Sequence, residues 1–237
     1  MNRAIAALFC CHLLSACGGD PEPSAVDQGR QLFESKALSQ SHLNDYTCAT
    51  CHDAEALTPP SKKSGAALAG VTLRSTFWGE QEPDLLSSIN ACRSNFMSDN
   101  QPLLASEDRA RSLYAYLASL EPGDANPSPF TIVTSIDPLP RGVEGRGRVL
   151  FAQACSYCHG GMHSGANRLS ARVPILPEDT LLEHAEYSAR VQRLVFTEKI
   201  RHGLFLGYGG VMPPFAAELL SDQDVSDLLE AMGVIDE

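Results

Sequence analysis

The sequence carries the same five-residue motif twice, and this repetition constrains the fold more than any other feature. CATCH occupies Cys48 to His52, and CSYCH occupies Cys155 to His159. With eight cysteines and seven histidines in 237 residues, a random chain would contain Cys-x-x-Cys-His about 0.008 times. Two copies therefore indicate two sites of the same kind, and the chain has to fold around both.

Two cysteines separated by two residues and followed directly by histidine are typical of covalent c-type haem attachment. The cysteines would form thioethers with the vinyl groups of two haems, and each histidine would ligate the iron from one face. These cofactor-binding residues are Cys48, Cys51, His52, Cys155, Cys158 and His159. A thioredoxin-like pair needs no histidine there and sits at a strand–helix junction, for which no pattern is seen. One zinc site built from all four cysteines is an alternative that counting does not reject.

The first residues predict a signal for export. Arg3 is a short positive region, and Ala4 to Leu14 form an apolar run too short to span a bilayer. The run ends in Leu14-Ser15-Ala16-Cys17, which resembles the lipobox of bacterial lipoproteins. The resemblance implies removal of residues 1–16 and attachment of lipid to Cys17. Ordinary signal cleavage near Ala16, with Cys17 left free, is the alternative. We expect an exported, lipid-anchored protein on the periplasmic or cell-surface side.

Proline and glycine divide the rest of the chain. Residues 17–28 lack apolar periodicity and predict a flexible tether. Five prolines between positions 122 and 141 prevent a long helix and predict a linker. Residues 29–121 and 142–237 then form two domains of about a hundred residues, each long enough for a small core around a haem.

The two domains repeat one another. Each begins with the phrase Gly-Arg-x-Leu-Phe, at Gly29 to Phe33 and at Gly147 to Phe151, and each continues to its CxxCH motif. Each ends in apolar residues at helical spacing, over 113–120 and over 225–232. Strand signals are almost absent, so both domains are predicted to be helical.

The ends of the domains align a pair of methionines. Ser106 and Ser221 precede the last helical pattern of each domain, where serine is favoured as a helix cap. Met97 and Met212 each lie nine residues before these serines. The alignment makes the two methionines candidate ligands at equivalent places.

Together these features resemble a tandem dihaem cytochrome c, over nearly all of residues 29–237. The resemblance implies an all-α fold with two cytochrome c-like helical domains in tandem, each wrapped round one covalently bound haem. In this family the first and last helices of a domain cross near the Gly-x-x-x-aromatic phrase. Its sixth iron ligand is commonly a methionine downstream of CxxCH.

For the second haem the resemblance points to Met212. The segment Gly207 to Phe215, GYGGVMPPF, is similar to the ligand loop of cytochrome c. A neutral thioether opposite His159 favours reduced iron and raises the potential. If Met212 were only core filler, the iron would be five-coordinate or would take another histidine. The candidates, expected at the surface by default, are His163, His184 and His202.

For the first haem two sulfur ligands compete opposite His52. The repeat alignment favours Met97. The segment Ile89 to Met97 also resembles thiosulfate dehydrogenases and SoxA-type cytochromes, which implies a Cys92 thiolate on the iron and makes Cys92 the catalytic residue if the protein is an enzyme. A thiolate lowers the potential relative to methionine. Arg93 would neutralise the thiolate or attract an anion, but a surface position is the expectation.

The first domain also departs from the family pattern. Phe33 and Cys48 are 15 positions apart, whereas Phe151 and Cys155 are 4 apart, so residues 34–45 form an insertion. His42, within it, is expected to face solvent. The middle of the first domain, residues 66–79, lacks the proline that the family often has after CxxCH, which the second domain has at Pro174. Trp78 is expected to pack on haem rather than bind substrate.

Charge narrows the function. The chain has 18 basic and 29 acidic residues and a formal net charge of −11. Acidity without basic clusters argues against nucleic acid and suits electrostatic steering toward basic redox proteins. We expect a carrier of single electrons between extracytoplasmic partners. The alternative is oxidation of thiosulfate or another sulfur anion at a His52/Cys92 haem; dihaem peroxidases, a third class, are generally longer.

Overall fold

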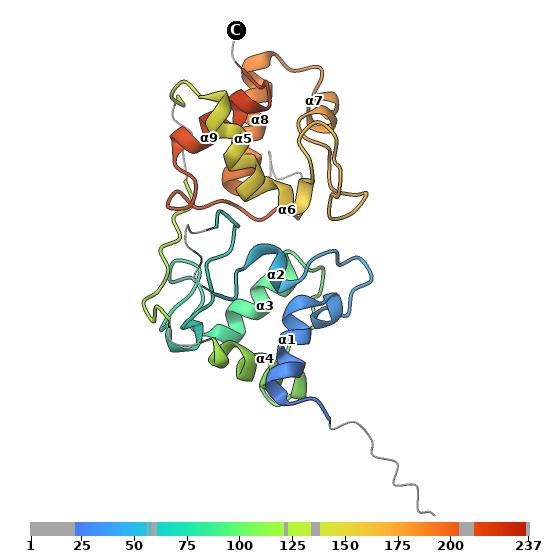
Figure 1. The fold of residues 1–237 in the computed structure, drawn as a ribbon, viewed down its shortest axis with the longest axis vertical. Coiled ribbons are helices and arrows are strands. Elements are labelled where there is room, and N and C mark those ends of the chain that lie inside the picture. The colour runs from blue at the N-terminus through green and yellow to red at the C-terminus, as the bar shows by residue number, and fades with distance from the viewer. Residues whose placement is uncertain are drawn as a thin grey trace, which may run out of the picture.

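The computed structural model describes residues 22–55, 57, 61–120, 123–133, 138–203 and 211–235. Its helices form two groups, one in each half of the chain (Figure 1). Within these ranges the only extended pairing is a single bridge between Phe77 and Glu82. The protein is therefore all-α, as predicted.

The first group contains α1 (Ala25–Glu34), the short 3-10 helix η1 (Lys36–Leu38), α2 (Cys48–Cys51), η2 (Val71–Leu73), α3 (Leu85–Asn95) and α4 (Asp108–Ser119). The second contains α5 (Glu144–Leu150), the π-helical turn η3 (Phe151–Cys155), α6 (Ser156–His159), α7 (Glu178–Glu183), α8 (Ala189–His202) and α9 (Asp222–Ala231). Residues 1–21 lie outside the described part of the chain, and with them the predicted signal and Cys17.

In the first domain, the first and last helices cross at a glycine. A Cβ atom added to Gly29 of α1 would lie 2.0 Å from the carbonyl oxygen of Ser112 in α4, so only glycine permits the contact. One turn further, the rings of Phe33 and Tyr116 are 5.4 Å apart. The expected crossing is confirmed, and it closes a core that also buries Leu113.

The second domain repeats this crossing. A Cβ atom on Gly147 of α5 would lie 1.8 Å from the carbonyl oxygen of Asp227 in α9. Phe151, Leu228 and Leu229 are buried in the core beneath the crossing. Here α5, η3 and α6 follow one another without a break, so the first helix leads directly into CSYCH.

Two helix starts differ from the prediction. The Ser24 hydroxyl accepts a hydrogen bond from the amide of Asp27 at 3.1 Å, so α1 begins at Ala25, inside the predicted tether of residues 17–28. The expected Ser106 cap is also wrong. Glu107 is the N-cap of α4, and its carboxylate accepts from the upstream amide of Leu104 at 2.8 Å.

Ser221 caps α9 as predicted. Its hydroxyl accepts from the amide of Asp224, whose carboxylate accepts from the Ser221 amide at 3.0 Å, which completes a capping box. This cap fixes the start of the helix that crosses α5.

The predicted linker, residues 122–141, is non-helical where it is described, and it lies against both domains. The Arg74 side chain donates to the carbonyl of Asp124 at 3.2 Å in the first domain. In the second domain, Glu218 accepts from the amide of Thr131 at 3.0 Å, and the amide of Ala217 donates to the carbonyl of Thr131 at 3.0 Å. This part of the linker is a fixed strap.

No helix within the described ranges combines the length and apolar character needed to cross a bilayer.

Candidate haem sites

The CATCH motif forms its own short helix. The Thr47 hydroxyl accepts from the amide of Thr50 at 3.2 Å, and the Thr50 hydroxyl accepts from the amide of Thr47 at 3.1 Å. This capping box defines the start of α2. Cys48, Cys51 and His52 all line one cavity of the first domain.

The ring of His52 is oriented by a backbone contact. Its Nδ1 lies 2.8 Å from the carbonyl oxygen of Ala66. A carbonyl can only accept, so Nδ1 carries the proton and Nε2 keeps the lone pair needed for iron. Burial lowers the pKa of His52, which favours the neutral ring. A Cβ atom on Gly65 would lie 2.5 Å from this ring, so the glycine leaves room for it.

His159 in the second domain repeats the arrangement. Its Nδ1 lies 2.9 Å from the carbonyl oxygen of Pro174, and the residue is buried. Burial lowers its pKa as well. The carbonyl of Ala66 accepts the Nδ1 proton of His52, as the carbonyl of Pro174 accepts that of His159. Alanine in place of proline therefore keeps the hydrogen bond to the motif histidine.

The first cavity has a volume of about 310 Å³, within the range of sites for small molecules and cofactors. Its wall is largely apolar. It includes Phe33, Leu38, Tyr46, Val71, Leu85 and Ile89 of the first domain, and Pro213, Pro214 and Leu219 of the second. The first site is therefore completed by residues of both domains.

Two buried polar atoms at this cavity have no hydrogen-bond partner among the described residues. They are Thr76 Oγ1 and Arg93 Nε. A buried donor without a hydrogen-bond partner destabilises the folded protein. A haem fits the cavity in this respect, because its two propionates are acceptors and the rest of the macrocycle is apolar. Trp78, stacked on Phe96 with ring centroids 6.0 Å apart, lines the same cavity.

Both candidate sulfur ligands of the first site reach this cavity. Cys92 and Met97 line it together with His52. Met97 is 4% exposed, and its carbonyl accepts from the Ser39 hydroxyl at 2.9 Å. Burial raises the pKa of the Cys92 thiol, and the nearby Cys48 adds to the rise. A thiolate there would thus depend on iron for its stability, and the choice between the two sulfurs stays a prediction.

Arg93 is not at the surface, as the sequence led us to expect, but is 1% exposed. Its guanidinium lies 2.6 Å from the carboxylate of Asp99, itself 4% exposed. The amides of Gln40 and Gln101 also donate to this carboxylate, at 2.8 and 3.1 Å. Although burial alone would raise the pKa of Asp99, these contacts hold it below its ordinary value. The charge of Arg93 is therefore balanced by Asp99, and only its Nε stays without a partner among the described residues.

In the second domain, Met212 is partly buried and packs against the core cluster. Residues 204–210, which include all three glycines of the predicted ligand loop, lie outside the described residues. The Met212 assignment therefore stays a prediction for the second site.

The other histidines have contacts of their own. His163 is exposed and lies 2.7 Å from Glu178. His202 is paired with Glu198 at 2.5 Å, and its other nitrogen contacts the carbonyl of Val133. His184 is mostly buried rather than at the surface, stacked on Tyr187 with ring centroids 5.5 Å apart. His42 is exposed, as expected.

The two CxxCH motifs meet at the interface between the domains. Helices α2 and α6 lie on the facing sides of their domains (Figure 1). Cys158 packs against the core cluster of the first domain. Burial raises the pKa of the Cys158 thiol to about 12, and the nearby Cys51 contributes. The two thiols are thus close enough to interact electrostatically, although 107 positions separate them.

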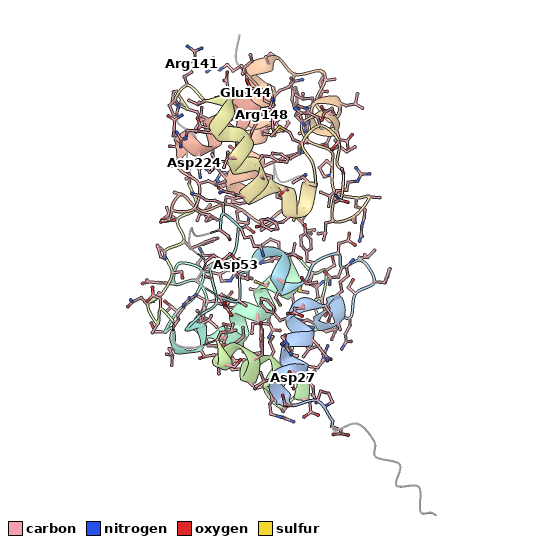
Figure 2. The ribbon with its side chains drawn as sticks, viewed as in Figure 1. Asp27, Asp53, Arg141, Glu144, Arg148 and Asp224 are labelled. Carbon is pink, nitrogen blue, oxygen red and sulfur yellow. The ribbon has the colours of Figure 1, made fainter. Side chains whose placement is uncertain are left out.

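Lys63 joins the two motifs directly. Its Nζ lies 4.7 Å from the ring centroid of Tyr157 inside CSYCH. It also donates to the carbonyl of Ala49 inside CATCH at 2.9 Å and pairs with Asp53 at 3.0 Å. Figure 2 shows Asp53 on the side of the first domain that faces the second. The neighbouring Lys62 donates to the carbonyl of Leu219 at 2.6 Å, so both lysines stabilise the interface.

A shared zinc site is not formed. No group of three or more histidine, cysteine or acidic side chains gathers to hold a metal ion within the described ranges, which include all four motif cysteines. Each motif instead presents one histidine with an available nitrogen, which suits one haem iron apiece.

Comparison with known proteins supports this interpretation for one half of the chain. Residues 144–230 match the family model for cytochrome C oxidase, cbb3-type, subunit III. The match begins with α5 and ends within α9, so it spans CSYCH, His159 and Met212. A search among curated proteins finds no match to the chain. Residues 144–230 are therefore similar to a c-type cytochrome domain, and this similarity supports covalent haem and electron transfer in this half of the chain.

Proposed function

We propose that the protein is a dihaem c-type cytochrome that transfers single electrons between redox partners outside the cytoplasm. One observation carries this proposal: CATCH and CSYCH face one another across the domain interface, where Lys63 contacts Ala49 of the first motif and Tyr157 of the second. Each haem would supply a one-electron Fe(III)/Fe(II) couple. Two such attachment sites at one interface suit passage of an electron within a single chain.

The chain's own residues would hold and tune these cofactors. The cysteine pairs would fix each macrocycle, and His52 and His159 would present Nε2 because their Nδ1 protons are engaged by carbonyls. Met212 would be the sixth ligand of the second iron, and Cys92 or Met97 that of the first. The apolar wall excludes water, which is one of the levers by which a protein raises a haem potential.

Location and partners rest on the sequence. Lipid on Cys17 would hold the protein at a membrane on the exported side. Its formal net charge of −11 suits a basic redox protein as the partner, since opposite charges accelerate encounter.

The test is a haem count together with spectroscopy of the ligands. Intact mass should show two covalent haems on the protein. Low-temperature EPR of the oxidised protein should then be compared with that of Cys92→Ala. Two His/Met-type signals unchanged by the substitution would support a simple carrier with Met97 as the ligand. A single haem would refute the dihaem proposal.

A second candidate function is oxidation of thiosulfate or a related sulfur anion. The observation that favours it is the position of Cys92 in the same cavity as His52. A low-spin thiolate-type EPR signal that disappears in Cys92→Ala would favour it further. Turnover of thiosulfate with an artificial electron acceptor would decide the matter. No turnover with several sulfur anions would exclude this candidate and leave the carrier.

A further inference from the structure

The insertion between α1 and α2 has no counterpart in the second domain and contains none of the predicted iron ligands or attachment cysteines. Its first half is anchored beside Met97. The Ser39 hydroxyl donates to the carbonyl of Met97 at 2.9 Å, and the Gln40 amide donates to Asp99 at 2.8 Å. Leu38, 1% exposed, is packed in the core of the first domain. This half of the insertion is therefore fixed to the segment that carries a candidate ligand of the first haem.

The second half reaches the other domain. The carboxylate of Asp45 lies 2.6 Å from the guanidinium of Arg172, which also donates to the carbonyl of Leu43 at 2.8 Å. The Tyr46 hydroxyl donates to the carbonyl of Val211 at 3.0 Å. The acceptor belongs to the residue just before Met212, so the bond holds the backbone at the predicted ligand of the second haem.

Tyr46 is held in place for this contact. Asn44, 6% exposed, accepts from the Tyr46 amide at 2.8 Å and donates to the Tyr46 carbonyl at 2.9 Å. The Tyr46 ring is 8% exposed and forms part of the wall of the first cavity. A residue packed in one site thus contacts the backbone of the other.

We infer that residues 34–46 form an interdomain clasp, in which Tyr46 of the first domain is a positioning residue for Met212 of the second. This inference rests on the proposed function, because it takes Met212 as an iron ligand. At one end of the clasp the Ser39 hydroxyl donates to the carbonyl of Met97, and at the other the Tyr46 hydroxyl donates to the carbonyl beside Met212. Ligation at the second haem therefore depends on a residue of the first domain.

The consequence is a measurable resistance of Met212 to displacement. Withdrawal of the methionine from iron moves the backbone that accepts the Tyr46 hydrogen bond. Loss of one neutral hydrogen bond should therefore let an external ligand replace Met212 at a concentration about threefold to tenfold lower. The population with methionine bound, and with it the potential of the second haem, should fall in the same direction.

The experiment is an imidazole titration of the oxidised full-length protein, followed by the near-infrared Met–Fe charge-transfer band. Tyr46→Phe keeps the ring in the cavity wall and removes only the hydroxyl. Tyr157→Phe is the matched control at the same interface, because the described contact of Tyr157 is made by its ring face. Met212→Ala identifies the spectral change that belongs to the second haem.

We expect Tyr46→Phe to lower the imidazole concentration for that change threefold to tenfold, with Tyr157→Phe like wild type. If Tyr46→Phe fails to fold, Arg172→Gln replaces it as the test, because Arg172 is not among the residues that line the cavity. It should also lower the imidazole concentration needed. Identical titrations of wild type and Tyr46→Phe, with two haems present, would overturn the clasp alone. A wild type with one haem would overturn the proposed function and the clasp with it.

Discussion

The two domains place the same histidine in the same way but reach it by different routes. In the second domain, α5, η3 and α6 lead from Gly147 to His159 without a break. In the first, an insertion separates α1 from α2; it contacts Arg172 of the second domain, and Tyr46, which follows it, contacts Val211. The comparison teaches that the repeated part of the sequence supplies the candidate haem-binding motifs, while the unrepeated part adds contacts between the domains.

A second comparison concerns two buried arginines on corresponding helices. Arg93 of α3 and Arg201 of α8 are each 1% exposed. The partner of Arg93 is Asp99, whose side chain is 4% exposed, whereas the partner of Arg201 is Asp222, whose side chain is 59% exposed. The same residue type thus forms a fully buried ion pair in one domain and a half-solvated one in the other.

The largest effect should come from removing the attachment cysteines of one domain at a time. Cys48→Ala with Cys51→Ala, and Cys155→Ala with Cys158→Ala, should each abolish one of two covalent haems, because no thioether can form. Intact mass of the purified proteins measures this loss. Cys92→Ala should keep both haems. A full haem complement in either double variant would show that the two motifs are not equivalent attachment sites.

Next, Arg93→Ala should destabilise the protein by about 3–5 kcal/mol, because it leaves the buried carboxylate of Asp99 without its charged partner. Arg201→Ala should cost only about 1–3 kcal/mol, since Asp222 stays solvated and the main loss is a hydrogen bond to the Leu220 carbonyl. Guanidinium unfolding of the haem-loaded variants measures both values. Equal costs would mean that the buried ion pair does not distinguish the domains.

A smaller and equal effect is expected where the domains are alike. Gly29→Ala and Gly147→Ala should each cost about 1–3 kcal/mol, because the new methyl group overlaps a carbonyl of the crossing helix. Gly145→Ala in α5 is the control. A Cβ atom there meets nothing within 4 Å, so alanine should stabilise the helix by about 0.5–1 kcal/mol. Thermal or guanidinium unfolding measures these changes. Unchanged stability in both Gly29→Ala and Gly147→Ala would show that the close helix crossing does not require glycine in either domain.

The smallest effect is the pH dependence of the contact between the domains. Burial alone would raise the pKa of Asp45, but hydrogen bonds from Ser170, Arg172 and Lys36 outweigh it and hold the pKa below the ordinary 3.8. The stabilisation is therefore full above pH 3.8 and is lost as the pH falls through the lower folded value.

Asp45→Asn checks this dependence. At neutral pH it should cost about 0.5–1 kcal/mol, because Arg172 is largely exposed and its charge is screened by water. Guanidinium unfolding at several pH values should show wild type and variant converging as the pH falls below 3.8. A difference that persists in acid would assign the effect to packing.

Much of the fold could be predicted from the sequence because it depends on local patterns. The CxxCH motifs, the helical spacing and the Ser221 cap each lie within a short segment whose chemistry indicates its role, and the resemblance to cytochrome c implied the crossing at Gly29 and Gly147. The all-α class follows from these patterns.

What could not be predicted depends on partners distant in sequence. Arg93 can be buried because it pairs with Asp99, whose carboxylate also accepts from the amide of Gln40 in the insertion. No periodicity or motif in the sequence predicts these contacts. The contact of Tyr46 with Val211 spans 165 positions. The motif histidine bonds to the carbonyl of Ala66 in one domain and of Pro174 in the other. Since every residue has a backbone carbonyl, the sequence cannot reveal which one is the acceptor.

Part of the wall of the first cavity is formed by residues that lie late in the sequence. Pro129 and Phe130 of the strap, and Pro213 and Leu219 of the second domain, complete a site that begins at Cys48. A chain made from its N-terminus thus presents its first attachment site open on one side until nearly the whole protein exists. We expect haem to join Cys48 and Cys51 during this interval, and chains truncated before Ser128 should accept it as readily as the full chain. In that case the order of the residues along the chain would also set the order in which the two sites are completed.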